Sequence, residues 1–452
     1  MLKRFACSFL AVLAFPAAAF ASGEAARYWP AWRGPSHDGV SPQGDPPIVW
    51  SETQNVRFKV AIPGRSLSSP VVWGDRVFVM TAVAVDDAAY AASREAAADR
   101  AERGEWPPEV APVEQRFLLL ALSRDDGRVL WQREATRRAP HESHYVDSGW
   151  STASPVTDGR RVFAHFGSNG TYAFDVDGKP LWQIDLGDMT TRNSFGEGSS
   201  PALHDDTLVI NWDHEGPSFL VALDAATGEP RWKVERPDEV TSWSTPLVVQ
   251  HGGRAQVVVS STGRSRGYDL ETGRELWSLA GMTTNVIPSP VHRDGVVYLT
   301  SGFRGAMLQA VDLARATGPL EESNAVRWSH ERDTPYVPSP LLYDDSIYFL
   351  KGNKNILSVL DADTGKPRYE IKRLDALGDV WASPVAAAGR VYVFDRDGKA
   401  VVLRHGPSFE LLAENELDGT VNGSPAIAGG EIFVQTREHL YCIARDGAKS
   451  VR

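Results

Sequence analysis

Short apolar runs alternate with tight polar turns along most of the chain, a pattern typical of antiparallel sheets. Residues 200–235 illustrate it. A strand over 201–203 is followed by a polar turn, and 207–212 forms a second strand rich in β-branched and apolar residues. A polar loop leads to a third strand over 219–224, and the turn at 225–228 leads to a fourth over 231–235. The pattern predicts a four-stranded antiparallel meander.

This unit recurs along the chain, and each copy opens with Ser-Pro or Thr-Pro. The opening residues are 69, 154, 200, 245, 289, 339, 383 and 424, so successive copies begin 85, 46, 45, 44, 50, 44 and 41 residues apart. A period of about 40–45 residues with four strands per unit is typical of a propeller blade. The sequence therefore predicts an all-β, eight-bladed β-propeller of four-stranded antiparallel blades.

An aromatic residue follows the glycine turn between the third and fourth strands of most units. These aromatics are Trp131, Trp182, Trp232, Trp277, Trp328 and Tyr369, whereas the seventh unit offers only Phe409 and Leu411 nearby. Both faces of a blade must be covered by its neighbours. We therefore interpret these side chains as contacts between adjacent blades and not as a carbohydrate-binding platform.

The eighth unit lacks a fourth strand, and the missing strand is expected near the start of the chain. Residues 46–70 read as a fourth strand, with Trp50 as its aromatic. Pairing of this segment with the last unit would close the ring and remove its free sheet edges. We predict a propeller over 46–452, preceded by an irregular Pro- and Gly-rich strap over 22–45 that runs along the disc.

Two units carry insertions. Residues 85–113 interrupt the first blade between its second and third strands, and 87–104 are rich in Ala, Glu and Arg, which predicts a helix. A smaller extension at 314–326 lies between the third and fourth strands of the fifth unit. It is expected on the opposite face of the disc.

The first 21 residues have the form of a secretory signal peptide. Lys3 and Arg4 precede an apolar run that ends in Ala-Phe-Ala at 19–21, a small-residue cleavage pattern. A membrane anchor is the alternative, which Pro16 within the run disfavours, and no later stretch is long enough to span a bilayer. We expect a periplasmic or secreted protein.

The charge and the cysteine content of the chain disfavour some partners and some stabilising bonds. With 47 Lys and Arg against 58 Asp and Glu, the formal net charge is -11, which argues against binding nucleic acid or an anionic membrane. Cys7 lies in the predicted signal peptide, so Cys442 would be the single thiol of the exported chain. An internal disulfide and a cysteine-based zinc site are therefore not expected.

Candidate binding residues gather in the loops that join second to third strands and successive blades. In a propeller these two sets of loops share one face, around the mouth of the channel, and the helical insertion joins them. We expect a ligand-binding face there. Its candidate residues are His141, His144, Tyr145, Trp150, Arg192, Asn193, Glu197, Asp213, His214, Trp243, Arg264, Arg266, Asn285, Arg304 and Trp381.

Several of these residues have two interpretations. His141 and His144 could bind a metal with Glu197 or His214, or they could hydrogen-bond neighbouring loops to each other. The arginines could clamp an anionic ligand or pair with acidic residues in adjacent loops. The sequence contains no Ser-His-Asp order, Walker loop or nucleotide fingerprint.

The recurring A-x-D-x-x-T-G-x-x-x-W pattern resembles the quinoprotein-type propeller repeat named for pyrroloquinoline quinone (PQQ). The resemblance covers the chain beyond the predicted signal peptide, and it implies either a quinoprotein dehydrogenase or a non-catalytic propeller like the outer-membrane β-barrel assembly factor. In the enzymes the quinone lies over a Ca²⁺ held by Glu, Asn and Asp, roles that Glu197, Asn285 and Asp379 would take here. The chain lacks their adjacent cysteine pair and haem-binding Cys-x-x-Cys-His. The predicted signal also lacks the lipid-attachment site of the assembly factor.

These observations lead to two hypotheses about function. The first is an exported, non-catalytic and monomeric propeller without a cofactor, which binds an envelope or secreted protein, or a small ligand, at the channel mouth. The alternative is a PQQ- or metal-dependent oxidoreductase with Ca²⁺ at the same mouth. Fold-level resemblance alone does not separate them.

Overall fold

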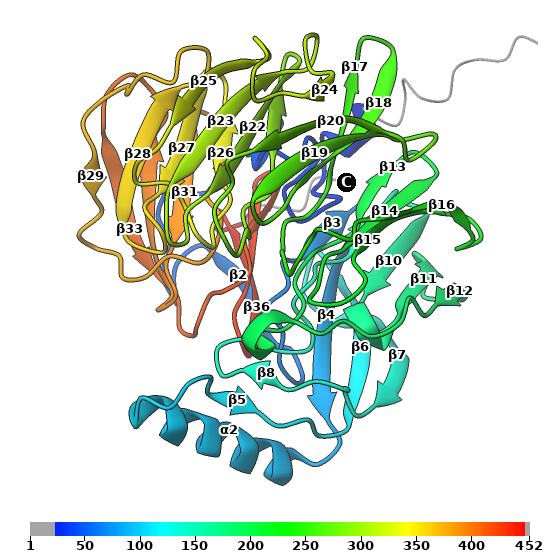
Figure 1. Ribbon diagram of the computed structural model, residues 1–452. Coiled ribbons are helices and arrows are strands. Elements are labelled where there is room, and N and C mark those ends of the chain that lie inside the picture. Colours follow the sequence, from blue (N-terminus) through cyan, green and yellow to red (C-terminus); the bar gives the residue numbers. More distant parts are fainter. Residues whose placement is uncertain (1–22, 448–452) are drawn as a thin grey trace, which may run out of the picture.

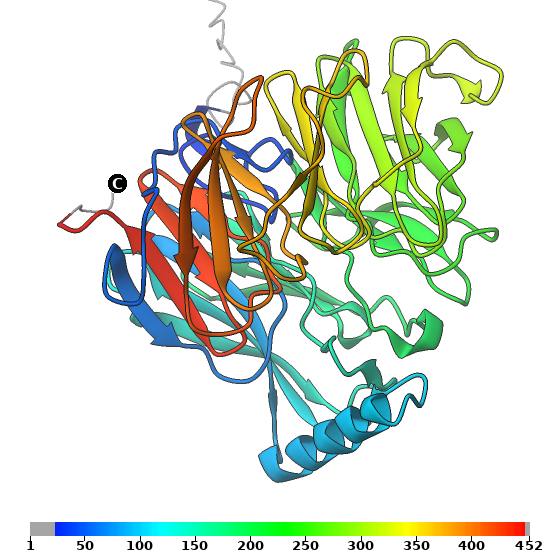
Figure 2. The same cartoon turned by 90° about the vertical axis from the view of Figure 1, so that its left-hand side faces the viewer.

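The computed structural model describes residues 23–447, which form a ring of eight sheets (Figures 1 and 2). In blades 1 to 7 the four blade strands are hydrogen-bonded in chain order as an antiparallel meander, and in blade 8 an N-terminal strand takes the fourth place. The predicted fold class is therefore confirmed. The predicted signal peptide at 1–21 lies outside the described residues and stays a prediction.

The strands of the first four blades have the following bounds. Blade 1 contains β3 (Val71–Trp73), β4 (Arg76–Ala84), β6 (Gln115–Ser123) and β7 (Val129–Arg138). Blade 2 contains β9 (Val156–Thr157), β10 (Arg161–His165), β11 (Thr171–Asp175) and β12 (Pro180–Ile184). Blade 3 contains β13 (Ala202–His204), β14 (Thr207–Trp212), β15 (Phe219–Asp224) and β16 (Pro230–Glu235). Blade 4 contains β17 (Leu247–His251), β18 (Arg254–Ser260), β19 (Arg264–Asp269) and β20 (Glu275–Ala280).

The remaining blades repeat this order. Blade 5 contains β21 (Val291–Arg293), β22 (Val296–Ser301), β23 (Met307–Asp312) and β25 (Val326–His330). Blade 6 contains β26 (Leu341–Tyr343), β27 (Ser346–Leu350), β28 (Ile356–Asp361) and β29 (Lys372–Arg373). Blade 7 contains β30 (Val385–Ala387), β31 (Arg390–Phe394), β32 (Lys399–Arg404) and β33 (Leu411–Glu416). Blade 8 contains β34 (Ala426–Ala428), β35 (Glu431–Gln435), β36 (His439–Ala444) and β2 (Val56–Ala61).

Four of the five fourth-strand tryptophans contact the adjacent blade, as predicted. Each lies against the glycine turn of the next blade, for example Trp182 against Gly228, and its indole N–H donates to a backbone carbonyl there. Trp131, Trp182, Trp232 and Trp328 donate to Val176, Ala225, Leu270 and Ala362 at 2.8–3.0 Å. Tyr369 contacts Phe409 of blade 7. Trp277 differs, because it is buried over Gly267 of its own blade and donates to Gln256 there.

The ring is closed by β2, which pairs with β36 in antiparallel register and places Phe58 opposite Cys442. Closure by an N-terminal strand is therefore confirmed, but the aromatic assigned to this strand was wrong. Phe58 holds the position that tryptophan holds in other blades, because its ring lies against Gly127 of blade 1. Trp50 precedes the strand and stacks on Tyr392 and Phe394 of blade 7.

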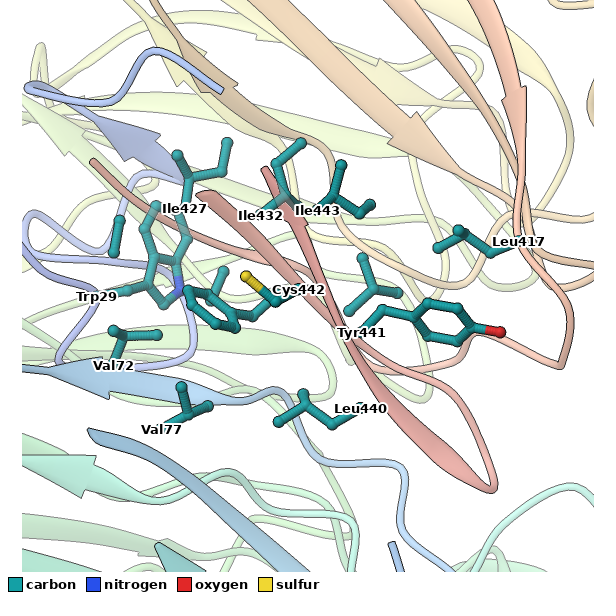
Figure 3. Packing of buried hydrophobic residues seen from close by; sticks show 14 of the residues in the cluster. Trp29, Val72, Val77, Leu417, Ile427, Ile432, Leu440, Tyr441, Cys442 and Ile443 are labelled. Carbon is teal, nitrogen blue, oxygen red and sulfur yellow. The ribbon is translucent and has the colours of Figure 1, made fainter. Parts of the chain in front are cut away.

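A continuous apolar core surrounds this closure (Figure 3). It joins blades 7, 8 and 1 with Trp29 of the N-terminal strap, and Cys442 lies within it. Burial raises the pKa of the Cys442 thiol. The closing strand is thus held by side-chain packing as well as by backbone hydrogen bonds.

The N-terminal strap does more than run along the disc. Its strand β1 (Val40–Ser41) pairs in parallel with β30, the first strand of blade 7. Trp29 bridges to Val72 of blade 1, and the buried Arg33 donates to the carbonyls of Pro340 and Pro384, each at 2.8 Å. The strap, dark blue in Figure 1, therefore ties the inner strands of several blades together.

The helical insertion is confirmed. Helix α2 (Asp87–Glu102) begins where the side chain of Asp86 accepts a hydrogen bond from the backbone of Ala89. After the helix, β5 (Glu109–Val110) pairs with β8 (His144–Tyr145) from the loop between blades 1 and 2. The resulting arm stands off from the ring in both views (Figures 1 and 2).

The extension of blade 5 begins between the third and fourth strands, as predicted. Its short strand β24 (Gly318–Pro319) then pairs in parallel with β20 of blade 4. Glu321 beyond it accepts from the backbone of Ala280 and pairs with Arg264. The extension thus folds along the outer edge of blade 4, where it covers a free edge.

Candidate functional site

The blades enclose a central cavity of about 400 Å³ on the loop-rich face. Its wall is built by the residue two positions before the Ser or Thr that opens each blade. These residues are Leu67, Thr152, Gly198, Trp243, Ile287, Val337, Trp381 and Asn422. The repeat that forms the fold therefore also places one residue from every blade opening at the cavity wall.

The Ser and Thr residues at the blade openings form a hydrogen-bonded chain around this wall. From blade 2 to blade 8, each hydroxyl oxygen accepts from the backbone N–H of the corresponding residue in the preceding blade. The links run Ser69–Ser154–Ser200–Thr245–Ser289–Ser339–Ser383–Ser424, at 2.9–3.1 Å. The proline that follows each residue favours extended backbone before it. Residues two positions apart on extended backbone face the same way, so the chain fixes the cavity wall.

Aromatic side chains from several loops crowd the cavity. Trp106, at the end of the helical arm, packs against Tyr145 and Phe195, with ring centroids 5.5 and 5.9 Å apart. Phe303 stacks on Tyr336 at 4.7 Å. All five line the cavity, and Trp106 is 61% exposed. An exposed ring of this size at a cavity is a feature of interaction sites.

Trp32 of the strap also lines the cavity, although the strap lies among the inner strands of the blades. The backbone of Pro30, two residues earlier, accepts a hydrogen bond from Thr157 of blade 2. Because β1 follows along blade 7, the strap crosses the channel beneath the cavity. The cavity is therefore a pocket with a floor.

A cationic cluster lies at the edge of the cavity between blades 7, 8 and 1. The guanidinium of Arg396 lies 4.1 Å from the Trp381 ring centroid and donates to Asn422 and Asp147. Arg437 pairs with the same Asp147 oxygen at 3.6 Å. Trp381, Asn422 and Asp147 line the cavity, so its wall combines aromatic surface with charge.

A second, much smaller cavity of about 40 Å³ lies beside it, between blades 2 and 3. Glu197 lines it and accepts from the backbone and the hydroxyl of Ser168, at 2.7 and 2.5 Å. Burial raises the pKa of Glu197 to about 7. His141 lines the same cavity and contacts the Met189 carbonyl at 2.6 Å, and Trp150 donates to the Glu142 carbonyl.

The predicted residues therefore divide between two cavities. Tyr145 and Trp381 line the central cavity, Trp243 lines both, and His141, Trp150, Glu197 and Asp213 line the small one. The other eight line neither cavity.

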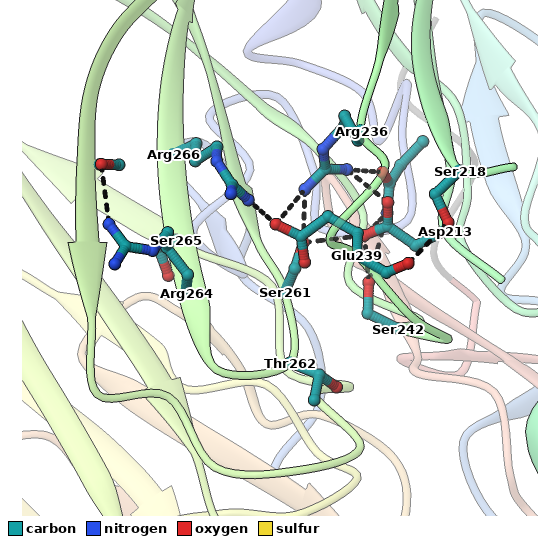
Figure 4. A network of polar contacts seen from close by, with 12 residues as sticks. Asp213, Ser218, Arg236, Glu239, Ser242, Ser261, Thr262, Arg264, Ser265 and Arg266 are labelled. Carbon is teal, nitrogen blue, oxygen red and sulfur yellow. Dashed lines mark hydrogen bonds and ion pairs between the residues drawn. The ribbon is translucent and has the colours of Figure 1, made fainter. Parts of the chain in front are cut away.

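Asp213 and Arg266 belong to a buried charge network between blades 3 and 4 (Figure 4). Asp213 pairs with Arg236 at 2.5 Å and accepts from Ser242 and Ser261. Arg266 pairs with Glu239 of the same network. These charges are compensated by one another, which is the role expected of buried ion pairs.

His144 is fully buried behind the mouth. Its Nδ1 contacts the Tyr145 carbonyl, and its ring meets Trp150 edge-on at 4.4 Å and Tyr90 of α2 at 6.4 Å. Burial lowers the pKa of His144 to about 4. His144 and His141 therefore do not share a site, and His144 anchors the arm.

The remaining candidates also hold loops together or face solvent. Arg192 pairs with Glu215 at 3.1 Å and donates to Asn285, while His214 accepts from the backbone of Thr190. Arg264 pairs with Glu321. Asn193 and Arg304 are exposed, with positive φ, and Arg304 lies over Phe303.

The ligand set implied by the quinoprotein resemblance does not assemble in one place. Glu197 lines the small cavity, Asn285 accepts from Arg192, and Asp379 is exposed and pairs with Lys354 at 2.8 Å. A cavity of about 40 Å³ beside Glu197 is too small for a three-ring quinone. These residues do not fit the group as a common site. Within residues 23–447, no three His, Cys, Asp or Glu side chains gather closely enough to hold a metal.

Several residues of the central cavity were not among the predicted ones: Trp32, Trp106, Phe195, Phe303, Tyr336 and Asn422. A signal for part of this set was present in the sequence. The position two residues before each Ser-Pro or Thr-Pro lines the cavity in all eight blades, and it includes Asn422. The loop aromatics carry no such regular spacing.

Comparison with known proteins agrees with this geometry. A family model described as "Outer membrane protein assembly factor BamB", a model of PQQ-like repeats, matches residues 40–197, 170–320 and 219–452. The chain belongs to this PQQ-like propeller family. This match confirms the predicted quinoprotein-type repeat, and the eight blades of the structure agree with it.

The relatives of this chain include both assembly factors and subunits of dehydrogenases. The outer membrane protein assembly factor BamB of Legionella pneumophila is 26% identical over 207 residues, 44% of this chain and 49% of that protein. Methanol dehydrogenase subunit 1 of Methylobacterium organophilum is 30% identical over 153 residues, 29% of this chain and 23% of that protein. The chain thus spans at most about half the length of these two relatives.

A solved structure shows the same fold. The quinohemoprotein alcohol dehydrogenase ADHIIG of Pseudomonas putida HK5 superposes with a TM-score of 0.56 at 11% identity, over 96% of this chain and 82% of that one. Within the described residues 23–447, no helix has the length and apolar character needed to cross a membrane.

Proposed function

We propose that this protein is an exported, non-catalytic propeller that binds a partner protein of the cell envelope through its central cavity. The observation that carries the proposal is the aromatic lining of a pocket that is open on the loop-rich face and floored by the strap. Exposed aromatic clusters of this kind are enriched at protein interfaces. Export rests on the signal sequence predicted at residues 1–21.

The size and shape of the cavity favour a protruding segment of another protein. About 400 Å³ accommodates one or two large side chains, and the helical arm beside the mouth adds further surface. An envelope partner is supported by the relatives named outer membrane protein assembly factors.

Site-specific photocrosslinking tests the proposal. A photoreactive residue at Phe303 is expected to trap an envelope protein, whereas the same residue at Leu411, 42% exposed on β33, is not. In a pull-down without the photoreactive residue, Phe303→Ala combined with Tyr336→Ala should abolish capture of the envelope protein identified by crosslinking, and Leu411→Ala should preserve it. Equal capture at both positions, or capture that survives the double substitution, would contradict the proposal.

A PQQ-dependent oxidoreductase is the second candidate, favoured by the similarity to a methanol dehydrogenase subunit over 153 residues. Titration with PQQ and Ca²⁺ tests it through absorbance and melting temperature. A saturable shift that Glu197→Ala removes would support the enzyme and overturn our first proposal. No saturable response of the parent protein to PQQ and Ca²⁺ would count against the enzyme.

A further inference from the structure

The cationic cluster at the edge of the central cavity contains more positive charge than its carboxylate neutralises. Arg396 and Arg437 both pair with a single oxygen of Asp147. Arg94 of helix α2 lies over the ring of Tyr90 and near both Arg437 and Asp147. Three guanidinium groups therefore lie around Asp147, and two of them pair with it.

The close approach of these like charges accompanies pKa values below the usual arginine range. Burial and the neighbouring Arg437 lower the pKa of Arg94, while burial and Arg396 lower that of Arg437. Glu438 is a further carboxylate that influences Arg437, but it does not pair with it at contact distance. An additional anion near the cluster would relieve this repulsion.

The cluster also contains buried hydrogen-bond donors without a partner. These are Nη1 of Arg94, Nε of Arg437 and Nδ2 of Asn422. All three are N–H groups, and a buried N–H without an acceptor is costly. Asn422 itself lines the cavity. The cluster therefore lacks hydrogen-bond acceptors, and the oxygens of a carboxylate would supply them.

The aromatic lining adds the second half of the recognition. Trp381 stacks on Arg396 and lines the cavity, so the charged edge and the aromatic wall are continuous. Phe303 and Tyr336 also line the cavity and are contributed by blades 5 and 6. A segment with an aromatic side chain next to an acidic one matches both surfaces.

We propose that the central cavity binds an acidic peptide segment of the partner, with an aromatic side chain in the pocket and a carboxylate on Arg396, Arg437 and Asn422. This rests on the proposed function and specifies the chemistry of the partner. The charge complementarity is local, because the arginine cluster attracts a carboxylate whereas the net charge of -11 disfavours a strongly polyanionic partner.

The test uses the full-length protein and three synthetic nonapeptides with blocked termini. The first contains Asp-Phe-Asp among Gly and Ser, the second has Asn in place of both Asp residues, and the third has Ala in place of Phe. Binding is measured by calorimetry and by the fluorescence of tryptophans that line the cavity. The acidic aromatic peptide should bind about 10-fold or more tightly than either control, and more weakly at high salt.

Variants assign the binding to the cluster. Arg396→Gln with Arg437→Gln should weaken binding of the acidic aromatic peptide about 10-fold or more. Arg404→Gln is the matched control, because Arg404 is exposed on β32 and pairs only with Glu410 in a surface contact. Asn422→Asp, nearly identical in shape, should also abolish the preference for acidic peptide, which keeps the test decisive if the double variant fails to fold.

Several results would overturn the inference: equal affinity for the three peptides, no binding at millimolar peptide, or stronger binding to phosphatidylglycerol vesicles than to peptide. Its failure is distinguishable from failure of the proposed function. If Phe303→Ala with Tyr336→Ala abolishes capture of the envelope protein while the arginine variants retain it, the proposed function stands and the acidic partner does not.

Discussion

Substitution of Phe58 by alanine should show how strongly the closing strand holds the ring. Phe58 is 8% exposed, lies against Gly127 of blade 1 and contacts Phe433 of its own blade. Burial of an aromatic side chain removes about 150–250 Å² from water, worth roughly 4–6 kcal/mol as an upper bound. Phe→Ala substitutions in cores cost about 3–5 kcal/mol. We expect the free energy of unfolding to fall by about 3–5 kcal/mol.

Urea unfolding followed by tryptophan fluorescence measures this loss, compared at an unchanged denaturant slope. Leu411→Ala is the control, because Leu411 is 42% exposed on the fourth strand of blade 7 and should change stability by about 0.5 kcal/mol or less. Hydrogen exchange should also quicken at β36, which pairs with β2, before it changes at β20. A loss below about 1 kcal/mol with unchanged exchange at β36 would refute the role of Phe58 in closure.

Three further outcomes follow from individual residues. Burial raises the pKa of Glu197 to about 7, so the contribution of its protonated form to stability is fully present below about pH 4.5 and is lost as pH rises through 7. Glu197→Gln should therefore gain stability relative to the parent between pH 5 and pH 8, and urea midpoints measured at pH 5 and at pH 8 will show this. Cys442 is fully buried, so a thiol reagent should modify it only at the rate of unfolding, and rapid labelling of the native protein would contradict its place in the core. Gly228→Ala should cost about 2 kcal/mol more than Gly252→Ala, because both have positive φ but only at Gly228 would a methyl group meet the Trp182 ring, and equal melting temperatures would argue against that contact.

The repeat made the fold predictable, because the same pattern of strands, turns and aromatic residues recurs in most blades. A strand, a glycine turn and an aromatic recur in register, and the contacts of Trp131, Trp182, Trp232 and Trp328 follow from that pattern. Closure was harder, because Trp50 and Phe58 both precede the first blade and the pattern did not show which one the strand presents to Gly127.

The strap was the least predictable segment. The buried Arg33 donates to the carbonyls of Pro340 and Pro384, which lie more than three hundred positions away. Local periodicity cannot predict contacts between such distant residues. The loop-rich face was predicted, but its division into two cavities was not. Glu197 and His141 line the small cavity between blades 2 and 3, whereas Trp381 lines the central one.

The pairing of β2 with β36 has a consequence for the order of events during synthesis. Asn55 and Asp446 hydrogen-bond across a separation of 391 positions, so nearly all of the remaining chain must be synthesised before β2 can pair with β36. At about 5–20 residues per second, that interval is roughly 20–80 seconds. Until then the nascent chain carries two unpaired strand edges, which are templates for aggregation. Binding of a chaperone to residues 56–61 would therefore protect the growing chain at the time it is most vulnerable.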